Sequence, residues 1–293
     1  MALCFTHVVM SGGGLSALSY FGALRFLEIE GLTSSVRHIA GTSMGAIFAA
    51  AFALRMPMAT IEQRFLDLMA DGSTNQLPLL DIVTYLQRLG LDDVKRFIEV
   101  LRPEADKMTF LELSKKTGIN LIICATHLAT MEAAYFGVDT TPHVLVMDAV
   151  RASAAIPWVF TPVRIGEELY VDGGVSNNVP VDVFHGVPQS NILVFHTAPK
   201  TIKMNDNNPY KQPLAYTVSV LSRCLMQAHG ISLYKSAYPH YLLFDNSPMP
   251  FLLVEFLPDG LKIKVTREDL DNCIAYGYNV AFSALRKFIR EET

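Results

Sequence analysis

The chain has 293 residues, of which 51% are hydrophobic and 18% are charged, and its formal net charge is −4. This length has room for a sizeable core, and the slightly acidic balance gives no electrostatic basis for binding nucleic acid. The apolar composition indicates either a large α/β core or some apolar surface kept for a membrane or a greasy substrate.

The cysteines and the apolar segments indicate the cellular compartment in which the protein works. Cys4, Cys124, Cys224 and Cys273 are scattered without a C-x-x-C pair, which favours reduced thiols over a disulfide framework or a zinc site. The N-terminal residues lack the charged and long apolar regions of a signal peptide. The longest apolar stretch, residues 44–54, is too short to span a bilayer. We therefore expect a cytoplasmic protein, and peripheral contact with membranes is left open.

In the first part of the chain, short apolar runs typical of strands alternate with segments whose apolar residues recur at helical spacing. In chain order we expect a strand at 5–10, a glycine loop at 12–14, a helix at 18–30, a strand at 38–40 and a buried helix at 46–54. A mainly helical stretch follows, with a helix around 61–68, a loop at 71–78, and short helices at 78–89 and 93–101. A capping box from Thr109 to Glu112 opens a further helix, which Gly118 ends.

The second part of the chain begins with strands and ends in a long helix. We expect strands at 120–125 and 132–137, a helix at 148–155, a strand at 191–196, a polar loop at 201–212, a helix at 214–229 and paired strands at 241–244 and 252–256. The apolar segment 250–257 is predicted to be a buried strand rather than a membrane-touching loop, and Thr266 to cap the last helix. No repeat or linker interrupts the chain. We therefore expect a single domain over 1–293, in which 186–293 packs on a core of about 6–185.

Glycine-rich segments carry the candidate chemistry, and the first contains a serine. Gly41-Thr42-Ser43-Met44-Gly45 is a G-x-S-x-G sequence between a short strand and a helix. A tight strand-to-helix turn presents the hydroxyl, and Gly41 and Gly45 remove side chains that would clash. The helix N-terminus behind Ser43 adds positive charge where an oxyanion develops. Ser43 is therefore a candidate nucleophile, with an ordinary turn serine as the alternative.

Two further glycine segments are less specific when taken alone. Gly12-Gly13-Gly14 lies between a strand and a helix, where its N–H groups suit a phosphate, an oxyanion or a plain tight turn. The G-x-G-x-x-G pattern fails at Ala17, and no Gly-Lys-Ser/Thr of a P-loop follows. Asp172, before Gly173 and Gly174, places a carboxylate at the end of an apolar run, with an Asx turn as the alternative.

Together these segments give a strong resemblance. The matching blocks are S-G-G-G at 11–14, G-T-S-M-G-A at 41–46, A-S-A-A-I-P at 152–157 and D-G-G-V-S-N-N-V-P at 172–180. In this order and spacing the chain resembles a patatin-like phospholipase across roughly residues 6–185, and Gly277-Tyr278 resembles the common end of these proteins. The resemblance implies a three-layer α/β fold, with a central mixed sheet, helices on both faces and the site at the strand ends.

The resemblance also implies a mechanism. Ser43 would attack an ester carbonyl, Asp172 would accept its proton directly as a Ser–Asp dyad, and water would hydrolyse the acyl-enzyme. Backbone N–H groups of Gly12, Gly13 and Gly14, chiefly the last two, would hold the oxyanion. A free Asp has a pKa of about 3.9, so burial would have to raise the pKa of Asp172. The expected activity is calcium-independent hydrolysis of fatty acyl esters of phospholipids or related lipids at a lipid surface. No cofactor or metal is implied, and the oligomeric state is left open.

One position departs from the family pattern. Family members usually carry Arg or Lys two residues after the third glycine and then Gly, where this chain has Ser16 and Ala17. The basic side chain supports the glycine loop, so its absence puts the rate and the headgroup preference in question. On this reasoning, Ser16→Arg is expected to raise turnover.

Three alternatives stay open. A conventional α/β-hydrolase would use a Ser–His–Asp triad with His196, His229 or His240 as base, although Ser43 comes early in the chain for that fold. A lipid-binding protein without turnover fits the missing basic residue. A phosphate-binding module fits the glycine loop alone.

Smaller features are given structural interpretations. His7, His38, His127, His143 and His185 are dispersed and show no metal-binding spacing. Asn177 and Asn178 are expected to shape the turn after Asp172 through side-chain hydrogen bonds rather than to contact substrate.

Overall fold

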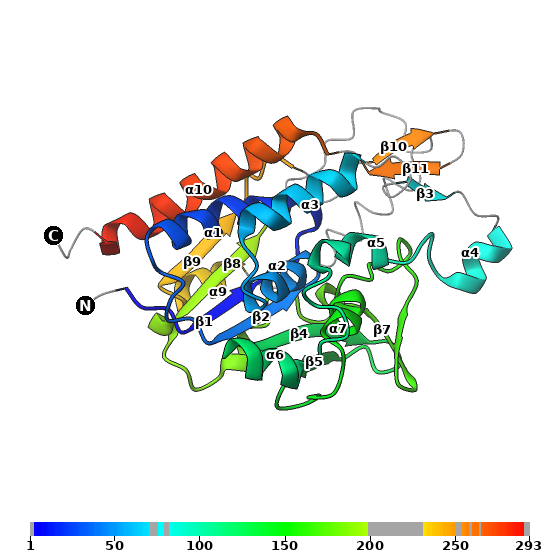
Figure 1. Cartoon of the computed structure of the whole chain (residues 1–293), viewed down its shortest axis with the longest axis horizontal. Helices are drawn as coiled ribbons and strands as arrows, with labels where there is room; N and C mark the ends of the chain where they lie inside the picture. Colours follow the sequence, from blue (N-terminus) through cyan, green and yellow to red (C-terminus); the bar gives the residue numbers. More distant parts are fainter. Residues whose placement is uncertain are drawn as a thin grey trace.

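A mixed β-sheet flanked by helices forms the centre of the computed structural model, which describes residues 3–70, 76–78, 82–198, 231–249, 254–257, 260–263 and 265–289 (Figure 1). Within these residues the sheet has eight strands in the order β6-β7-β4-β2-β1-β8-β9, with β5 also paired to β4. The strands are β1 (His7–Met10), β2 (His38–Thr42), β4 (Asn120–His127), β5 (Ala133–Gly137), β6 (Val163–Ile165), β7 (Glu168–Asp172), β8 (Ile192–Thr197) and β9 (His240–Phe244).

The five neighbouring strands β4, β2, β1, β8 and β9 run parallel, whereas β5, β6 and β7 are antiparallel to the strands they pair with. Parallel strands are apolar along most of their length because both of their faces are covered. In β1, Val8 and Met10 join the larger core and Val9 joins a second core, as the two-residue period of a strand requires. The parallel region therefore separates two buried layers.

Helices cover both faces of the sheet. α1 (Tyr20–Ile29), α2 (Met44–Ala53) and α10 (Arg267–Ile289) contribute to the larger core, and η4 (Val181–Phe184) and α9 (Ile231–Ala237) to the second. The other helices are η1 (Gly14–Ser19), α3 (Met58–Ala70), α4 (Ile82–Arg88), α5 (Lys95–Ile98), η2 (Glu99–Leu101), α6 (Phe110–Thr117), α7 (Val146–Ser153), η3 (Gly173–Val175) and η5 (Gln189–Asn191). The predicted three-layer α/β architecture with a central mixed sheet is confirmed.

The last helix, α10, lies along α1 (Figure 1). A Cβ atom at Gly22 would overlap the carbonyl oxygen of Ile274, and one at Gly277 would overlap that of Ser19. The two backbones approach this closely only because both positions are glycine. The contact ties the end of the chain to the helix behind the glycine loop. That position agrees with a C-terminal part packed on the core, and the single domain stays a prediction.

Two expectations about strands are wrong. β9 pairs with β8 in the main sheet, so the strand at 241–244 does not pair with the one at 252–256. A small second sheet instead joins β10 (Val254–Leu257) to β11 (Gly260–Ile263), and β11 to β3 (Gln76–Pro78), which occupies the end of the predicted loop at 71–78. The polar loop at 201–212, the helix at 214–229 and the start of the apolar segment, 250–253, lie outside the described residues.

The predicted helix caps are confirmed. Glu112 N–H donates to Thr109 Oγ1 at 3.2 Å, Thr109 N–H donates to Glu112 Oε2 at 2.9 Å, and Gly118 ends α6 in the left-handed region at φ 70°. Asp269 N–H likewise donates to Thr266 Oγ1 at the start of α10. These caps satisfy N–H groups that a helix leaves unpaired.

Two histidines that are far apart in the sequence lie together. His7 and His38 begin the neighbouring strands β1 and β2, and their rings stack with centroids 4.5 Å apart. Burial, and to a lesser extent the charge of His38, lowers the pKa of His7 to about 4. The description of the histidines as dispersed is wrong for this pair. Across the described ranges, no group of three or more His, Cys, Asp or Glu side chains is arranged to hold a metal ion.

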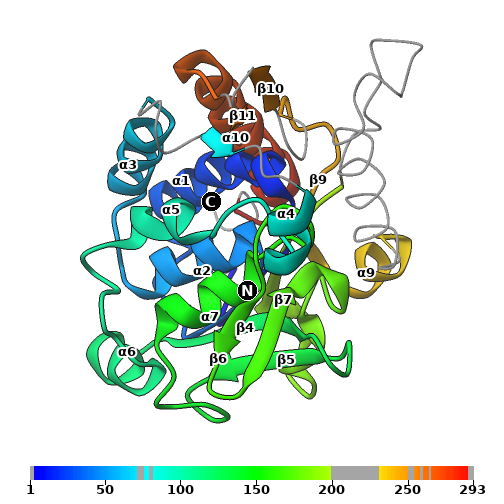
Figure 2. The same ribbon diagram turned by 90° about the vertical axis from the view of Figure 1, so that its right-hand side faces the viewer.

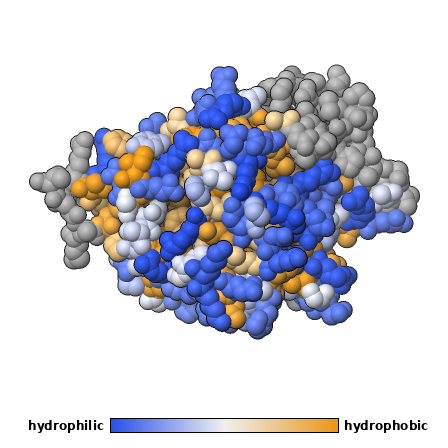
Figure 3. All heavy atoms as spheres, in the orientation of Figure 1, coloured by the Kyte–Doolittle hydropathy of each residue, from blue (hydrophilic) through white to orange (hydrophobic). Residues whose placement is uncertain are grey.

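The visible surface in Figure 3 is largely hydrophilic, with apolar residues in small groups. In the part of the chain that the structure describes, no helix has the length and apolar character needed to cross a bilayer. Among the residues that the structure describes, the large apolar side chains that are exposed are Ile29, Leu86, Leu89, Met131, Trp158 and Phe282.

Candidate active site

Ser43 stands at a sharp turn between β2 and α2. Its φ of 55° lies in the left-handed region, which is strained for a residue other than glycine. Gly45 packs against the backbone of Met10 and Ser11, and Gly41 packs against the start of α2, so a Cβ atom at either glycine would clash. The predicted strand–turn–helix elbow is therefore present, with Gly41 and Gly45 in the supporting places.

The register of the sheet brings Asp172 to Ser43 from 129 residues away. Thr42 of β2 pairs with Cys124 of β4, and the next residue of β4, Ala125, pairs with Asp172 at the end of β7. Ser43 and Asp172 thus stand level on either side of β4. The Ser43 hydroxyl donates directly to Asp172 Oδ2 at 2.6 Å. No third residue stands between the two groups.

The two glycines after Asp172 shape its surroundings. The Gly174 N–H donates to Asp172 Oδ1 at 2.7 Å. A Cβ atom at Gly173 would overlap the Cys124 carbonyl, so only glycine allows the chain to turn this close to β4. Both carboxylate oxygens are therefore hydrogen-bonded.

The Asp172 carboxyl group is shielded from solvent, with only 2% of the residue exposed. Burial raises the pKa of Asp172 to about 7, and the hydrogen bonds from Ser43 and Gly174 oppose part of that rise. The expectation that burial raises this pKa is confirmed. A carboxylate with a pKa near neutrality holds a proton much more firmly than a free aspartate, as a general base must.

The glycine loop lies directly beside Ser43. A Cβ atom at Gly12 would come within 2.7 Å of the Ser43 Cβ, and one at Gly13 would overlap the Thr197 side chain. The Gly12 carbonyl accepts hydrogen bonds from Thr197 Oγ1 at 2.6 Å and from Asn178 Nδ2 at 3.2 Å. Because the peptide unit is planar and trans, these two bonds also fix the direction of the Gly13 N–H.

Ser16, where the family pattern has a basic residue, is almost fully buried. Its hydroxyl donates to the Met249 carbonyl at 2.9 Å, and its own carbonyl accepts from Ser247 Oγ at 3.1 Å. Ser19 Oγ lies 2.9 Å from the same Ser247 oxygen. The segment after the glycine loop is thus held by a cluster of serines. The expected effect of the missing basic side chain on the rate and the headgroup preference stays a prediction, and these hydrogen bonds show what holds Ser16 in its place.

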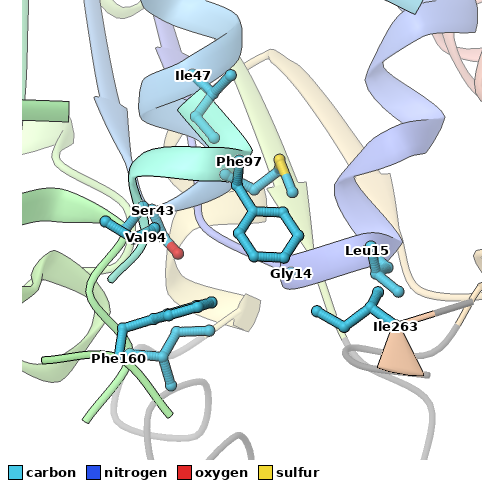
Figure 4. A pocket seen from close by; sticks show the side chains of 11 residues that line it. Gly14, Leu15, Ser43, Ile47, Val94, Phe97, Phe160 and Ile263 are labelled. Carbon is cyan, nitrogen blue, oxygen red and sulfur yellow. The ribbon is translucent and has the colours of Figure 1, made fainter. Parts of the chain in front are cut away.

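An apolar cavity opens beside Ser43. Its walls come from α2, α5, η1, the segment after α7 and β11, and the lining residues are Gly14, Leu15, Ser43, Met44, Ile47, Val94, Phe97, Ala154, Ile156, Phe160 and Ile263. Figure 4 shows the Ser43 hydroxyl pointing into this space, toward the rings of Phe97 and Phe160. The cavity suits a hydrocarbon chain that ends at a carbonyl group.

The histidines considered for a triad lie elsewhere. His196 is in β8, and the Nδ1 atom of its ring is hydrogen-bonded to the Tyr241 hydroxyl. Its neighbour Thr197 points toward Gly12, so His196 projects from the opposite face of the strand. His240 packs between the rings of Phe5 and Phe288. His229 lies outside the described residues.

Two supporting residues, Ser153 and Thr197, were not identified from the sequence. Ser153, in the A-S-A-A-I-P block, accepts a hydrogen bond from the Ser43 N–H at 2.8 Å. Thr197 and Asn178 hold the Gly12 carbonyl, so Asn178 acts beyond its own turn. Asn177 donates to Tyr135 and to Asp182. The motif blocks contained Ser153 and Asn178, but no spacing rule points to Thr197.

A profile of the patatin-like phospholipase family matches residues 8–185, which is more than half of the chain. The chain belongs to the patatin-like phospholipase family. This matched region contains the glycine loop, Ser43 and Asp172, and it confirms the resemblance seen in the motifs. As a patatin-like protein the chain is, in general terms, a lipid acyl hydrolase.

Relatives of this patatin-like chain include proteins from viruses, bacteria and yeasts. The "probable lipid hydrolase 463L" of Invertebrate iridescent virus 6 is 26% identical, covering 71% of this chain and 75% of the viral one. The uncharacterized protein YqhO of Bacillus subtilis is 29% identical over 80% of this chain and 85% of its own. Triacylglycerol lipase ptl3 of Schizosaccharomyces pombe is 27% identical over 61% of this chain and 43% of its own.

Solved structures share the fold. VipD from Legionella pneumophila superposes with a TM-score of 0.60 and 18% identity, covering 97% of this chain and 67% of VipD. ExoU of Pseudomonas aeruginosa, solved with SpcU, gives a TM-score of 0.51 and 15% identity over 97% of this chain and 52% of ExoU. The patatin-like architecture therefore extends beyond the matched residues into the C-terminal part.

Proposed function

We propose that this chain hydrolyses fatty acyl esters of phospholipids or related lipids through an acyl-enzyme on Ser43, with Asp172 as the base. The proposal rests above all on the 2.6 Å hydrogen bond from the Ser43 hydroxyl to Asp172 Oδ2. Burial gives that carboxylate a pKa of about 7, so at neutral pH a large fraction is ready to accept a proton.

In the first half of the reaction, Asp172 takes the hydroxyl proton as Ser43 Oγ attacks the ester carbonyl carbon. Negative charge then develops on the carbonyl oxygen, and the N–H groups of Gly13 and Gly14 are the proposed donors to it. The bond between the carbonyl carbon and the alcohol oxygen breaks, and Asp172 returns its proton to the departing alcohol. The acyl group remains on Ser43.

In the second half, water attacks the acyl-enzyme and passes a proton to Asp172. The tetrahedral intermediate collapses, Ser43 Oγ recovers that proton, and the fatty acid leaves. No step needs a metal ion, because the proposed oxyanion donors are backbone amides. We therefore propose that hydrolysis is independent of calcium and survives chelation.

The lining of the cavity supports an acyl group as the part of the substrate that is buried. Apart from Ser43, its walls consist of aliphatic, aromatic and glycine residues, so a charged headgroup would lose its hydration there without a partner. The headgroup would then remain outside, and the acyl position is not specified by these contacts. The name of the yeast triacylglycerol lipase is the reason to include neutral glycerides among the related lipids.

A fluorophosphonate probe tests the proposal without a guess at the substrate. We expect the probe to label the folded chain once, at Ser43, as read by peptide mass spectrometry, and Ser43→Ala to abolish labelling. Ser114→Ala serves as the matched control, because Ser114 lies in α6 and hydrogen-bonds to Asn120 instead of facing the cavity. A folded chain that resists the probe would contradict the proposed nucleophile.

A further inference from the structure

Two exposed apolar residues near the cavity adopt an unusual backbone conformation. Leu89 is 44% exposed with φ 57°, and Trp158 is 47% exposed with φ 70°. Bulky residues rarely adopt positive φ, and when they do the surrounding structure must hold them there. Both side chains thus stand on strained backbone, and each leaves nearly half of its surface exposed.

The segments that begin with these two residues run side by side. The Leu91 N–H donates to the Val159 carbonyl at 3.0 Å, and the Thr161 N–H donates to the Asp92 carbonyl at 2.9 Å. Gly90 lies so close to the backbone of Phe160 that a Cβ atom would clash. Leu89 and Trp158 are therefore neighbours that a rigid backbone pairing holds in place.

The same two segments also build the cavity wall. Ile156 and Phe160, on either side of Trp158, line the cavity, and so do Val94 and Phe97, shortly after Leu89. Leu86, one turn earlier in α4, is 56% exposed. Figure 2 looks onto this end of the molecule, from which α4 projects toward the viewer. We call Leu86, Leu89 and Trp158 the apolar rim.

The charges beside the apolar rim do not oppose a lipid surface. Asp92 is paired with Arg96, and Asp93 lies 3.1 Å from Arg151 and 3.3 Å from Lys95. Arg88, which is exposed, adjoins Leu89 and carries a positive charge toward the solvent. Tryptophan, aliphatic side chains and a nearby cation are residue types that favour the boundary between the headgroups and the acyl chains of a bilayer.

We propose that the apolar rim inserts into the surface of a phospholipid bilayer, so that the mouth of the cavity opens onto the acyl chains. This inference rests on the proposed function, because insertion into a bilayer assists the reaction only if the substrate is a membrane lipid. Insertion would let an acyl chain pass from the bilayer into the cavity along a continuous apolar path, without crossing water.

The sequence supplies its own reporter, because Trp158 is the single tryptophan of the chain. We expect Ser43→Ala, which leaves the vesicles intact, to show a blue-shifted emission with phosphatidylcholine vesicles and quenching by lipids brominated in the upper acyl chain. An unchanged spectrum at millimolar lipid would overturn the proposal. A blue shift that follows protein concentration without vesicles would also overturn it, because it would assign the rim to a second copy of the chain.

Variants show whether the rim itself binds. Leu86→Gln retains a good helix former, and Leu89→Asn places a residue that tolerates positive φ. We expect the double variant to weaken vesicle binding by fivefold or more in a sedimentation assay, with normal melting. The matched control is Ile29→Gln, which removes an equally apolar side chain, 69% exposed, at the end of α1. That helix end precedes the first residue of β2, whereas Ser43 follows the last one, so the two lie at opposite ends of the strand. Equal loss in both variants would contradict the proposal.

One further measurement separates this inference from the proposed function. The unmodified chain is assayed on a short-chain ester that is dissolved as monomers. Ester hydrolysis without any vesicle binding would refute membrane insertion by the apolar rim and leave the proposed esterase activity standing. Vesicle binding without hydrolysis of any ester would refute the esterase activity and leave membrane insertion standing.

Discussion

The Ser153 hydroxyl accepts the backbone N–H of Ser43 at 2.8 Å and donates to the Cys124 carbonyl at 2.5 Å. One buried hydroxyl thus links α7 to the turn after β2 and to the middle of β4. Since Ser43 has a strained backbone, this link helps to hold the turn in its left-handed conformation.

Ser153→Ala is expected to leave a buried N–H and a buried carbonyl without this partner, which costs roughly 1–3 kcal/mol in the free energy of unfolding. The rate of labelling by a fluorophosphonate should fall tenfold or more, because the turn that aims Ser43 loses its tie. Ser114→Ala, which removes the hydrogen bond from the Ser114 hydroxyl in α6 to Asn120, should keep the labelling rate of the unmodified chain. Equal rates in all three proteins would show that Ser153 has no part in positioning Ser43.

Asp172→Asn is expected to lower kcat by about 10²–10⁴-fold, because an amide cannot accept the Ser43 proton. His196→Ala and His240→Ala should each leave kcat within about tenfold, since neither histidine approaches the hydrogen bond between Ser43 and Asp172. Rates and melting temperatures are measured together. A histidine variant that melts normally but is as inactive as Asp172→Asn would replace the dyad by a triad.

The same substitution is expected to stabilise the protein. The folded-state pKa of Asp172 is raised from 3.8 to about 7, so its contribution to stability is full below pH 3.8 and is lost as the pH rises to 7. A shift of this size corresponds to roughly 4 kcal/mol. At pH 8, Asp172→Asn should therefore raise the free energy of unfolding, by about 1–3 kcal/mol after the amide rearranges its hydrogen bonds. A lower melting temperature at pH 8 would contradict this.

The pH dependence of activity follows from the same carboxyl group. Because the base acts only when deprotonated, kcat/KM is expected to fall tenfold per pH unit below about 7 and to level off above it. The measurement uses a soluble, uncharged ester, so that the substrate does not titrate. An acid limb centred near pH 4 would mean that the group in action is not the buried Asp172.

Ser16→Arg is now expected to lower both kcat and the melting temperature. The Ser16 hydroxyl is bonded to the Met249 carbonyl inside a buried serine cluster, where a guanidinium group would have to displace the neighbouring segment. Ser16→Ala is the milder companion variant, and a loss smaller than that of Ser16→Arg is expected. An increase in kcat on phospholipid would restore the expectation drawn from the family pattern.

The elements around the site were predictable because their signals are local. Gly12 to Gly14, Gly41 to Gly45 and Asp172 to Gly174 each combine a short apolar run with a glycine turn, and the structure has the expected elements there. Thr109 with Glu112 likewise marks the start of α6 within four residues.

Pairings between distant segments could not be predicted in this way. The strand at 241–244 pairs with β8, 47 residues earlier in the register, and nothing in its own sequence specifies that partner. The roles of Ser153 and Thr197 depend on the same long-range register, because each hydroxyl acts on a loop from another part of the chain. Ser16 is a further example, because the family pattern gave no information on its buried partner 233 residues away.

β4 carries neither member of the proposed dyad, yet it sets the distance between them. Ser43 is placed by the pairing of β2 with β4, and Asp172 by the pairing of β7 with β4. A strand advances about 3.3 Å per residue, so a slip of one position in either pairing would break the 2.6 Å hydrogen bond. Ser43 therefore becomes reactive only when three strands from distant parts of the chain have joined in register. In a refolding experiment, labelling of Ser43 would measure the completion of the sheet centre rather than the collapse of the chain.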